Sequence, residues 1–312
     1  MKKRGFSLFG RDKQGEDVLC ENCRSIMKKK YRHMSKREHA DFFKCPKCKL
    51  LWAPTLNFDT SFQSSLNERK RQDALQDVRE QEFDDVLALL KKHVPQGRGL
   101  DVGCSYGWFI EKAEKLYEME GIEAEEQVAQ KARDKGMHVC TGMFPQDLNL
   151  KNGKYDFIIF NNVWEHINYT TDLIDNTLEY LKEHGMLVIT VPLSSGGMYL
   201  VSECFEKLGR VKELVRLWQL HFHSPHFYFY TKKNLEQMMV KRGCELIECR
   251  DIRSINVDKM KDRFEMDTEE KYAALKALLF KGIYPVLKRM PADKAVFFFR
   301  YDSKVREIEE TI

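Results

Sequence analysis

Apolar runs and amphipathic segments alternate along most of the 312-residue chain. From residue 66 to 94 apolar side chains recur at roughly helical intervals among charged ones, and Pro95, Gly97 and Gly99 end the pattern, which predicts a long helix. Strand-like and helical segments then follow in this order: GLDVGC, a helix from Trp108, EGIE, a helix through Ala129, HVCTG, YDFIIF, a helix over 171–181 and MLVITVP. This succession predicts a doubly wound α/β domain with a mostly parallel sheet.

The alternation of strand-like and helical segments ends after Pro192. The stretch 198–220 is rich in Leu, Val and charged residues, and the cluster HFHSPHFYFY follows it, so we expect a helical cap inserted over about 196–230. A helix over 231–242, the strand CELIECRDI, a helical segment near 269–287 and the run AVFFFRYD complete the pattern. The last two apolar runs are able to pair as an antiparallel hairpin at the edge of the sheet, although the sequence alone does not fix the strand order.

The chain divides into three parts. Residues 53–65, APTLNFDTSFQSS, lack clear periodicity and contain turn formers, as is typical of a linker. We therefore expect a small ribbon over 1–52, a linker and long helix over 53–95, and the α/β domain over 96–312.

Four of the nine cysteines fall into two CxxC pairs separated by 21 residues: Cys20, Cys23, Cys45 and Cys48. This spacing is typical of a four-thiolate zinc site, and four protein ligands leave no open position, so we expect a structural Zn²⁺. A redox dithiol is the alternative, but such pairs usually begin a helix in a βαβ setting, which is absent here. A chain of this length needs no disulfides, so we expect the thiols to be reduced.

Charge is unevenly distributed. Residues 1–50 hold 15 Lys and Arg against 6 Asp and Glu, a net charge of +9, and the whole chain carries +4, which leaves −5 for the remainder. A basic ribbon favours contact with polyanions such as RNA, phosphorylated carriers or nucleotide sugars, although a solvated Lys-rich surface gives the same composition. The chain has no run of eighteen apolar residues and no signal-peptide pattern, so we expect a cytoplasmic protein without membrane insertion.

A glycine-containing turn follows the first strand of the α/β domain. Asp101, Gly103, Ser105 and Gly107 lie between that strand and a helix, where the backbone turns tightly and approaches a ligand. Twenty-two residues beyond Asp101 a second strand ends in Glu123, from which a carboxylate accepts hydrogen bonds from ribose hydroxyls. Turn and acid together indicate a nucleoside ligand. A dinucleotide is the rival ligand, but the spacing and the EH segment at 165–166 suit it less.

The segments LDVGCSYGWF through GIE, KYDFIIFNNVWEHI, LKEHGMLVITVP and HSPHFYFYTKKNLEQMMVKRG resemble class I methyltransferases that use S-adenosylmethionine (SAM). More narrowly, they resemble the bacterial branch in which a CxxC ribbon precedes the domain. The resemblance implies a Rossmann-like seven-stranded sheet. It also implies donor-binding roles for Asp101, Gly103, Cys104, Ser105, Gly107, Glu123, Gly142, Met143, Phe144, Asn161 and Asn162. Ser105 replaces the usual central glycine of the turn, which makes the loop slightly less permissive.

Methyl transfer from a sulfonium needs mainly alignment of the acceptor and exclusion of water. For a hydroxyl acceptor a histidine base accelerates transfer, and the candidates are His166, His221, His223 and His226. Glu165, His166 and His223 are our catalytic candidates, although a histidine at a helix start can simply bond the backbone. The EH pair also resembles ubiquinone-pathway O-methyltransferases that hold a divalent cation. Because Asn162 stands where they have a third acidic ligand, we expect no catalytic cation.

Three classes of function follow. The first is O-methylation of a small-molecule or carbohydrate acceptor, such as a sugar nucleotide or polysaccharide precursor, with the aromatic cluster over 222–230 as a lid. Core packing of the cap against the sheet explains most of those rings better than a lid does. The second is an RNA or protein methyltransferase that grips its substrate through Lys28, Lys29, Lys30 and Arg32 of the ribbon. The third is a non-catalytic SAM-binding protein.

Overall fold

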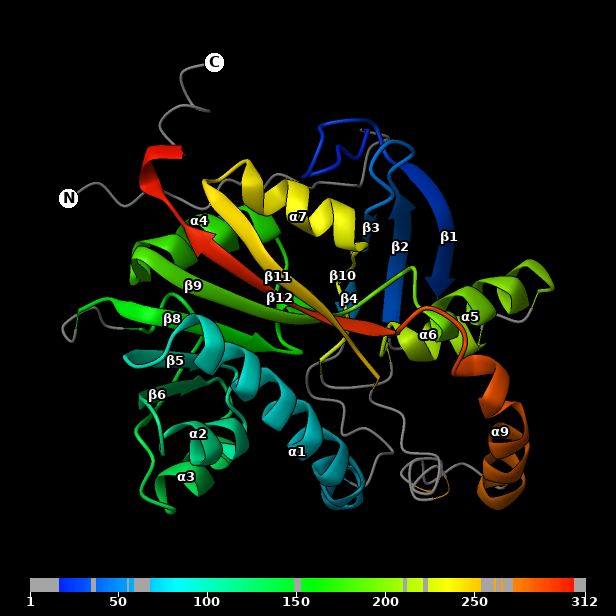
Figure 1. Cartoon of the computed structure of the whole chain (residues 1–312). Coiled ribbons are helices and arrows are strands. Elements are labelled where there is room, and N and C mark those ends of the chain that lie inside the picture. Colours follow the sequence, from blue (N-terminus) through cyan, green and yellow to red (C-terminus); the bar gives the residue numbers. More distant parts are fainter. Residues whose placement is uncertain are drawn as a thin grey trace.

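A seven-stranded sheet forms the centre of the molecule (Figure 1). The computed structural model describes residues 17–34, 38–54, 56–58, 68–148, 153–209, 212–220, 224–253 and 272–305, together with 261 and 265. The strands are β5 (Arg98–Val102), β6 (Glu118–Glu123), β7 (Val139–Thr141), β8 (Tyr155–Asn161), β9 (Leu181–Pro192), β11 (Cys244–Ile252) and β12 (Lys294–Tyr301). Their order is β11-β12-β9-β8-β5-β6-β7, and β12 runs antiparallel to both of its neighbours. The predicted mostly parallel Rossmann-like sheet is confirmed.

Helices cover both faces of this sheet because both faces of its strands are apolar. On one face α1 (Glu68–His93), α2 (Trp108–Ala113) and α3 (Glu126–Arg133) pack in a buried cluster with Phe157 and Ile159 of β8. On the other face α4 (Thr170–Tyr180) and α7 (Lys232–Val240) pack with Ile158 and Phe160. The alternation along β8 thus divides the core into two layers.

A smaller sheet joins the ribbon to the cap. It contains β1 (Lys28–Met34), β2 (Glu38–Lys44), β3 (Leu51–Trp52) and β4 (Asn57–Phe58), and also β10 (Tyr228–Phe229) from the end of the cap. The cap helices are α5 (Gly197–Lys207) and α6 (Lys212–Leu217). Phe42 of β2, Trp218 after α6 and Phe229 of β10 share a third buried cluster. Ribbon and cap therefore fold against each other, and the division of the chain at 52 and 95 stays a prediction.

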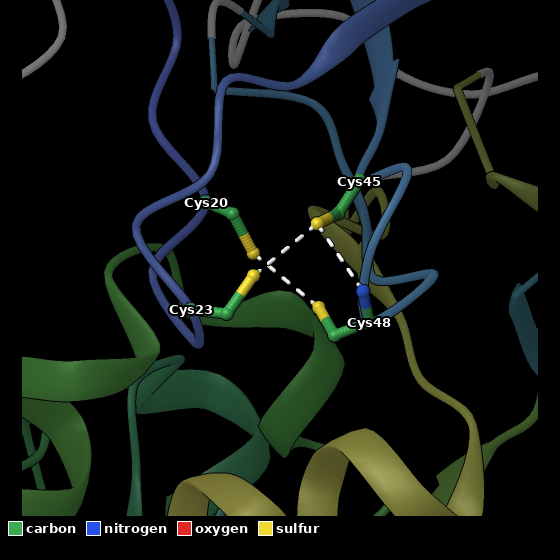
Figure 2. A group of neighbouring side chains, drawn as sticks. All are labelled: Cys20, Cys23, Cys45 and Cys48. Carbon is green, nitrogen blue, oxygen red and sulfur yellow. Dashed lines mark hydrogen bonds between the residues drawn. The ribbon is translucent and has the colours of Figure 1, made fainter.

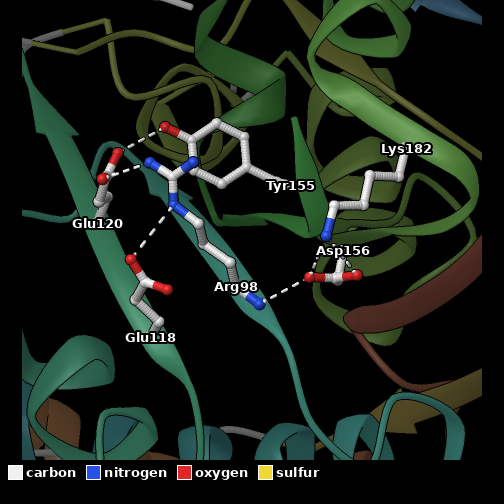
Figure 3. A network of polar contacts seen from close by, with 6 residues as sticks. All are labelled: Arg98, Glu118, Glu120, Tyr155, Asp156 and Lys182. Carbon is white, nitrogen blue, oxygen red and sulfur yellow. Dashed lines mark hydrogen bonds and ion pairs between the residues drawn. The ribbon is translucent and has the colours of Figure 1, made fainter. Parts of the chain in front are cut away.

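A polar network ties the strands together at the edge where the parallel strands begin (Figure 3). The Arg98 backbone N–H donates to Asp156 at 2.8 Å, and the Arg98 guanidinium pairs with Glu120. Tyr155 donates its hydroxyl to Glu120 at 2.7 Å, and Lys182 bonds both oxygens of Asp156 at 2.9 Å. These contacts link β5, β6, β8 and β9 at the edge opposite to the carboxyl ends of the strands. The carboxyl ends are consequently free to carry a ligand site.

The remaining long element, α9 (Ala273–Leu287), lies at the periphery, near α5 and α6 in Figure 1. Within the described part of the chain, no helix combines the length and the apolar character that crossing a membrane requires.

Candidate functional site

Two equivalent turns bring the four ribbon cysteines together (Figure 2). In each turn the residue after the second cysteine has a positive φ, 57° at Arg24 and 66° at Lys49. Its N–H donates to the carbonyl of the first cysteine, at 2.8 Å for Cys20 and 3.1 Å for Cys45. The two CxxC segments thus adopt the same local conformation, with their sulfur atoms on one side.

The four sulfur atoms have the spacing of metal ligands. Cys20 and Cys48 Sγ lie 3.4 Å apart, as do Cys23 and Cys45 Sγ, and all four lie within 4.8 Å of one another. These distances are too long for disulfides and near the ~3.8 Å edge of a tetrahedron with metal–sulfur bonds of about 2.3 Å. The Cys48 backbone N–H also points at Cys45 Sγ, at 3.4 Å. The thiol set therefore fits a closed tetrahedral Zn²⁺ site.

At the carboxyl end of β5 the backbone adopts the left-handed conformation three times. The φ angles are 70° at Gly103, 51° at Ser105 and 75° at Gly107. A Cβ at Gly103 would lie 2.6 Å from Val163, and one at Gly107 would lie 2.2 Å from Met137 Sδ. The conformation favours glycine at both positions, and at 103 the β-branched Val163 also leaves no space for a Cβ. Ser105 adopts the same conformation with a side chain.

Glu123, at the end of β6, holds this turn in place. Its Oε2 accepts the Ser105 N–H at 2.9 Å, and its Oε1 accepts the Glu125 N–H at 3.0 Å. A carboxylate offers about four acceptor positions, so both oxygens can still accept hydrogen bonds from a ligand. The structure thus brings Glu123 and the glycine turn together, as the sequence predicts.

Asp101 and Cys104 are buried beneath the turn. Burial raises the pKa of Asp101 well above its usual range, and the charge of Glu123 adds to this effect. Burial likewise raises the pKa of the Cys104 thiol. The Asp101 Oδ1 atom has no hydrogen-bond partner among the described residues. A buried carboxyl oxygen without a partner favours a ligand that donates a hydrogen bond to it.

The segment after β7 presents its three predicted site residues differently. Gly142 has a φ of 152°, and the Met143 N–H donates to Asp147 Oδ2 at 2.8 Å. The Met143 side chain is exposed, whereas the Phe144 ring is buried against Phe160 at a centroid distance of 5.6 Å. The Phe144 side chain therefore belongs to the core, and the Met143 side chain is the one that a ligand can reach.

After β8 the two asparagines have different surroundings. Asn161 Oδ1 accepts the Thr190 hydroxyl at 3.4 Å, while its Nδ2 is buried without a partner among the described residues. Asn162 has a φ of 57°, and its Nδ2 donates to Glu82 of α1 at 3.0 Å. Its Oδ1 accepts from Lys294 at 3.3 Å, and Lys294 also pairs with Glu82. This trio lies at the carboxyl edge of the sheet.

Glu82 and Lys294 were not predicted from the sequence as site residues. Glu82 is a buried charge beside Phe83 and one helical turn before Val86, both of which face the core. A carboxylate on the apolar side of a predicted helix is the signal that could have identified it, because buried charges need a partner.

The catalytic candidates Glu165 and His166 form the short helix η2 (Trp164–His166) after β8. Glu165 is buried, and this burial raises its pKa to about 8, although the charge of Lys294 acts in the opposite direction. His166 Nδ1 lies 3.0 Å from the carbonyl oxygen of Pro225. Since a carbonyl only accepts, Nδ1 carries the proton, and in the neutral ring Nε2 is the basic nitrogen.

His226, from the end of the cap, completes this cluster. Its ring lies 4.7 Å from that of His166, and its Nε2 lies 4.0 Å from Glu165 Oε1. The Gln219 amide donates to His226 Nε2 at 2.8 Å, and burial holds the pKa of this imidazole well below its usual range. Glu165, His166 and His226 place potential ligand atoms within 4.8 Å of one another. The acid that related cation sites have three positions earlier is here Asn162, already bonded to Glu82 and Lys294.

The other predicted histidines, His221 and His223, lie outside the described residues. Of the aromatic cluster, Tyr228, Phe229 and Tyr230 are buried. Tyr228 stacks on Trp52 of the ribbon with ring planes 7° apart, and the Tyr230 hydroxyl bonds that of Thr170 at 2.7 Å. The described rings thus serve core packing rather than a lid.

Comparison with known proteins extends these observations. A family model described as a methyltransferase domain matches residues 68–249. An uncharacterized protein of Methanocaldococcus jannaschii is 28% identical over 106 residues, which are 34% of this chain. The chain spans about half of that relative's length, 49%.

Solved structures with a similar arrangement include a SAM-dependent methyltransferase of Thermotoga maritima, with a TM-score of 0.48 and 17% identity over 75% of this chain and 94% of the other. Another is the magnesium protoporphyrin IX methyltransferase of Synechocystis, with a TM-score of 0.48 and 14% identity over 74% and 87%.

Proposed function

We propose, since the chain belongs to the methyltransferase domain family, that it transfers a methyl group from SAM to a hydroxyl of a small-molecule or carbohydrate acceptor. The donor would lie at the carboxyl ends of β5, β6 and β8, and the acceptor would lie near η2. SAM supplies an electrophilic methyl group when it is bound. The residues of this chain bind this donor, orient the acceptor and remove the proton of the acceptor's hydroxyl.

The turn and Glu123 supply the groups that a donor of this kind needs. Glu123 Oε1 and Oε2 lie at the end of β6, the strand next to β5, within reach of ribose hydroxyls. The glycines at 103 and 107 leave the backbone open to close approach. Asp101 Oδ1, which has no hydrogen-bond partner among the described residues, would accept from a donor group of the ligand. Gly142, Met143 and Asn161 would border the adenine and the sulfonium.

The hydrogen bond from His166 Nδ1 to the Pro225 carbonyl is the observation that carries the O-methylation proposal. It fixes the ring and selects the tautomer whose Nε2 accepts a proton, as a general base for a hydroxyl requires. Glu165 and His226 pack beside this ring and are buried, so we assign them positioning roles.

We further propose that the four ribbon cysteines hold a structural Zn²⁺. The two equivalent turns and the sulfur distances support this assignment. Because Cys20 and Cys45 belong to the same buried cluster as the main sheet, the metal would stabilise the docked ribbon and, through it, the whole protein.

Charge pairing of the ribbon cations favours a small acceptor over RNA. Lys29 and Arg32 both pair with Asp41, and Lys30 pairs with Glu203 of α5. Cations that already have carboxylate partners offer less attraction to a polyanion. Reversal of these charges should spare turnover of a small acceptor and should abolish it for a nucleic-acid substrate.

A transfer assay tests the proposal directly. The protein is incubated with SAM labelled in its methyl group and with separated host metabolites, glycans and RNA, and the labelled fraction is identified by mass spectrometry. A label in a small molecule or glycan, linked through oxygen, supports the proposal. A label in RNA or protein favours the second class of function, and SAM binding without any labelled product favours a non-catalytic role.

A further inference from the structure

Helix α9 exposes a row of large apolar side chains. Five of them are between 53% and 67% exposed: Leu275, Leu278, Leu279, Ile283 and Val286. At 100° per residue these positions fall within an arc of about 140° on one side of the helix. Isolated exposed apolar residues are common, but a contiguous row marks a surface that binds a partner or a membrane.

The opposite side of the same helix packs against the protein. Ala273 and Phe280 are buried there, and Tyr284 and Leu287 are partly buried. The exposed row is therefore a second apolar face, distinct from the one that anchors the helix.

The charged residues of α9 itself and of the five positions after it have one sign. Residues 272–292 contain the cations Lys276, Lys281, Lys288 and Arg289 and no acidic residue. Long cationic side chains beside an apolar face can extend to the lipid headgroups while their stems lie on the apolar surface. A second copy of α9 on this face would bring like charges together, whereas an anionic bilayer matches them.

The length of α9 limits how it can bind a bilayer. Its 15 residues extend about 22 Å, less than the ~30 Å of a hydrocarbon core, so a position parallel to the surface fits and a spanning position does not.

The segment after α9 leads directly to the site edge of the sheet. Lys294, the first residue of β12, pairs in register with Pro192, the last residue of β9. The Pro291 carbonyl accepts the Gly197 N–H at 3.0 Å, and Asp293 Oδ1 accepts the Met198 N–H at 2.7 Å, which fastens this segment to α5. Helix α9 is thus joined to the edge that carries Glu165 and Glu123.

We propose that α9 docks the protein onto the surface of an anionic phospholipid bilayer, with its exposed apolar row in the interface.

Vesicle sedimentation of the full chain tests this proposal. Phosphatidylcholine vesicles with and without phosphatidylglycerol are compared for the wild type and for Leu278→Glu/Leu279→Glu. The matched control is Leu208→Glu, which introduces a glutamate at an exposed leucine (76% exposed) directly after α5. Circular dichroism and melting curves establish that all three proteins are folded; since the changed side chains are exposed, we expect unaltered curves.

We expect the wild type and Leu208→Glu to sediment with the anionic vesicles, and the double variant to bind at least about tenfold more weakly. Lys281→Glu/Lys288→Glu should weaken binding to the anionic vesicles in the same direction. Failure of the wild type to bind anionic vesicles would overturn the proposal, as would equal binding by the folded double variant. A wild-type dimer that Leu278→Glu/Leu279→Glu dissociates, with no vesicle binding, would assign the face to a second copy instead.

Discussion

The ammonium of Lys294, the first residue of β12, is ion-paired with the buried carboxylate of Glu82 on α1, 212 positions earlier in the chain. Both side chains also bond the amide of Asn162 at the end of β8. The pair therefore joins the helix before the glycine turn to the last strand of the sheet, beside the proposed acceptor site.

Removal of the lysine should be strongly destabilising. Lys294→Met removes the ammonium that pairs with the buried Glu82 carboxylate, which should lower the free energy of unfolding by about 3–5 kcal/mol. Urea denaturation measures the change. The double variant Glu82→Gln/Lys294→Met, which removes both charges, should recover most of the loss; equal destabilisation of the single and double variants would contradict this account.

Glu165 should make stability depend on pH. Its pKa is raised from about 4.5 to about 8, so the fold favours the neutral carboxyl. Stability from this group is fully present below pH ~4.5 and declines as the pH rises to ~8, because the unfolded chain releases the proton first. Glu165→Gln should therefore gain in melting temperature relative to the wild type between pH 5 and 8. His226 lies 4.0 Å from Glu165, and burial holds its pKa well below its usual range. A difference that is constant with pH would argue against a raised pKa of Glu165.

The His166 base can be tested by turnover. His166→Ala should lower kcat by roughly 10²–10⁴-fold with little change in donor affinity, because the ring acts on the acceptor proton. His223→Ala, at the other predicted base, should also lower turnover. His138→Ala, at an exposed histidine before β7, is the matched control and should retain wild-type turnover. Full activity of His166→Ala would contradict a role of His166 as the base and would mean that the protein acts only by aligning the acceptor.

The ribbon cysteines predict a metal content. Elemental analysis should find about one zinc per wild-type chain and almost none in Cys48→Ser. Cys204→Ser, at an exposed cysteine of α5, should retain the metal. Chelation should lower the melting temperature of the whole protein, since Cys20 and Cys45 share a core cluster with the sheet. A zinc-free wild type purified under reducing conditions would contradict the site.

Features that depend on a few neighbouring residues were predictable from the sequence. The turn at Gly103 and Gly107 was predictable because a backbone with positive φ between a strand and a helix favours glycine. The two CxxC turns were also predictable, because the spacing within each pair brings its two sulfur atoms to the same side of the turn. The mostly parallel pairing in the main sheet followed from the lengths and order of the apolar runs. The antiparallel pairing of β11 and β12 is confirmed.

Contacts between distant segments were not predictable in this way. Nothing local to His226 indicates that its ring lies against His166, 60 positions earlier, or that Phe229 joins the ribbon sheet opposite Leu51. These contacts depend on how the cap returns to the body of the protein. The same holds for Glu82 and Lys294, whose partners are set by tertiary packing.

The central claim is that the turn over 101–107 and Glu123 bind the methyl donor. Isothermal titration calorimetry of SAM with the wild type, Glu123→Ala and Glu118→Ala tests it most directly, because Glu118 lies at the opposite end of the same strand. We predict saturable binding to the wild type and to Glu118→Ala, and an affinity at least about tenfold weaker for Glu123→Ala, which loses both the ribose acceptor and the bond to Ser105. Equal affinity in all three folded proteins would contradict the assigned site.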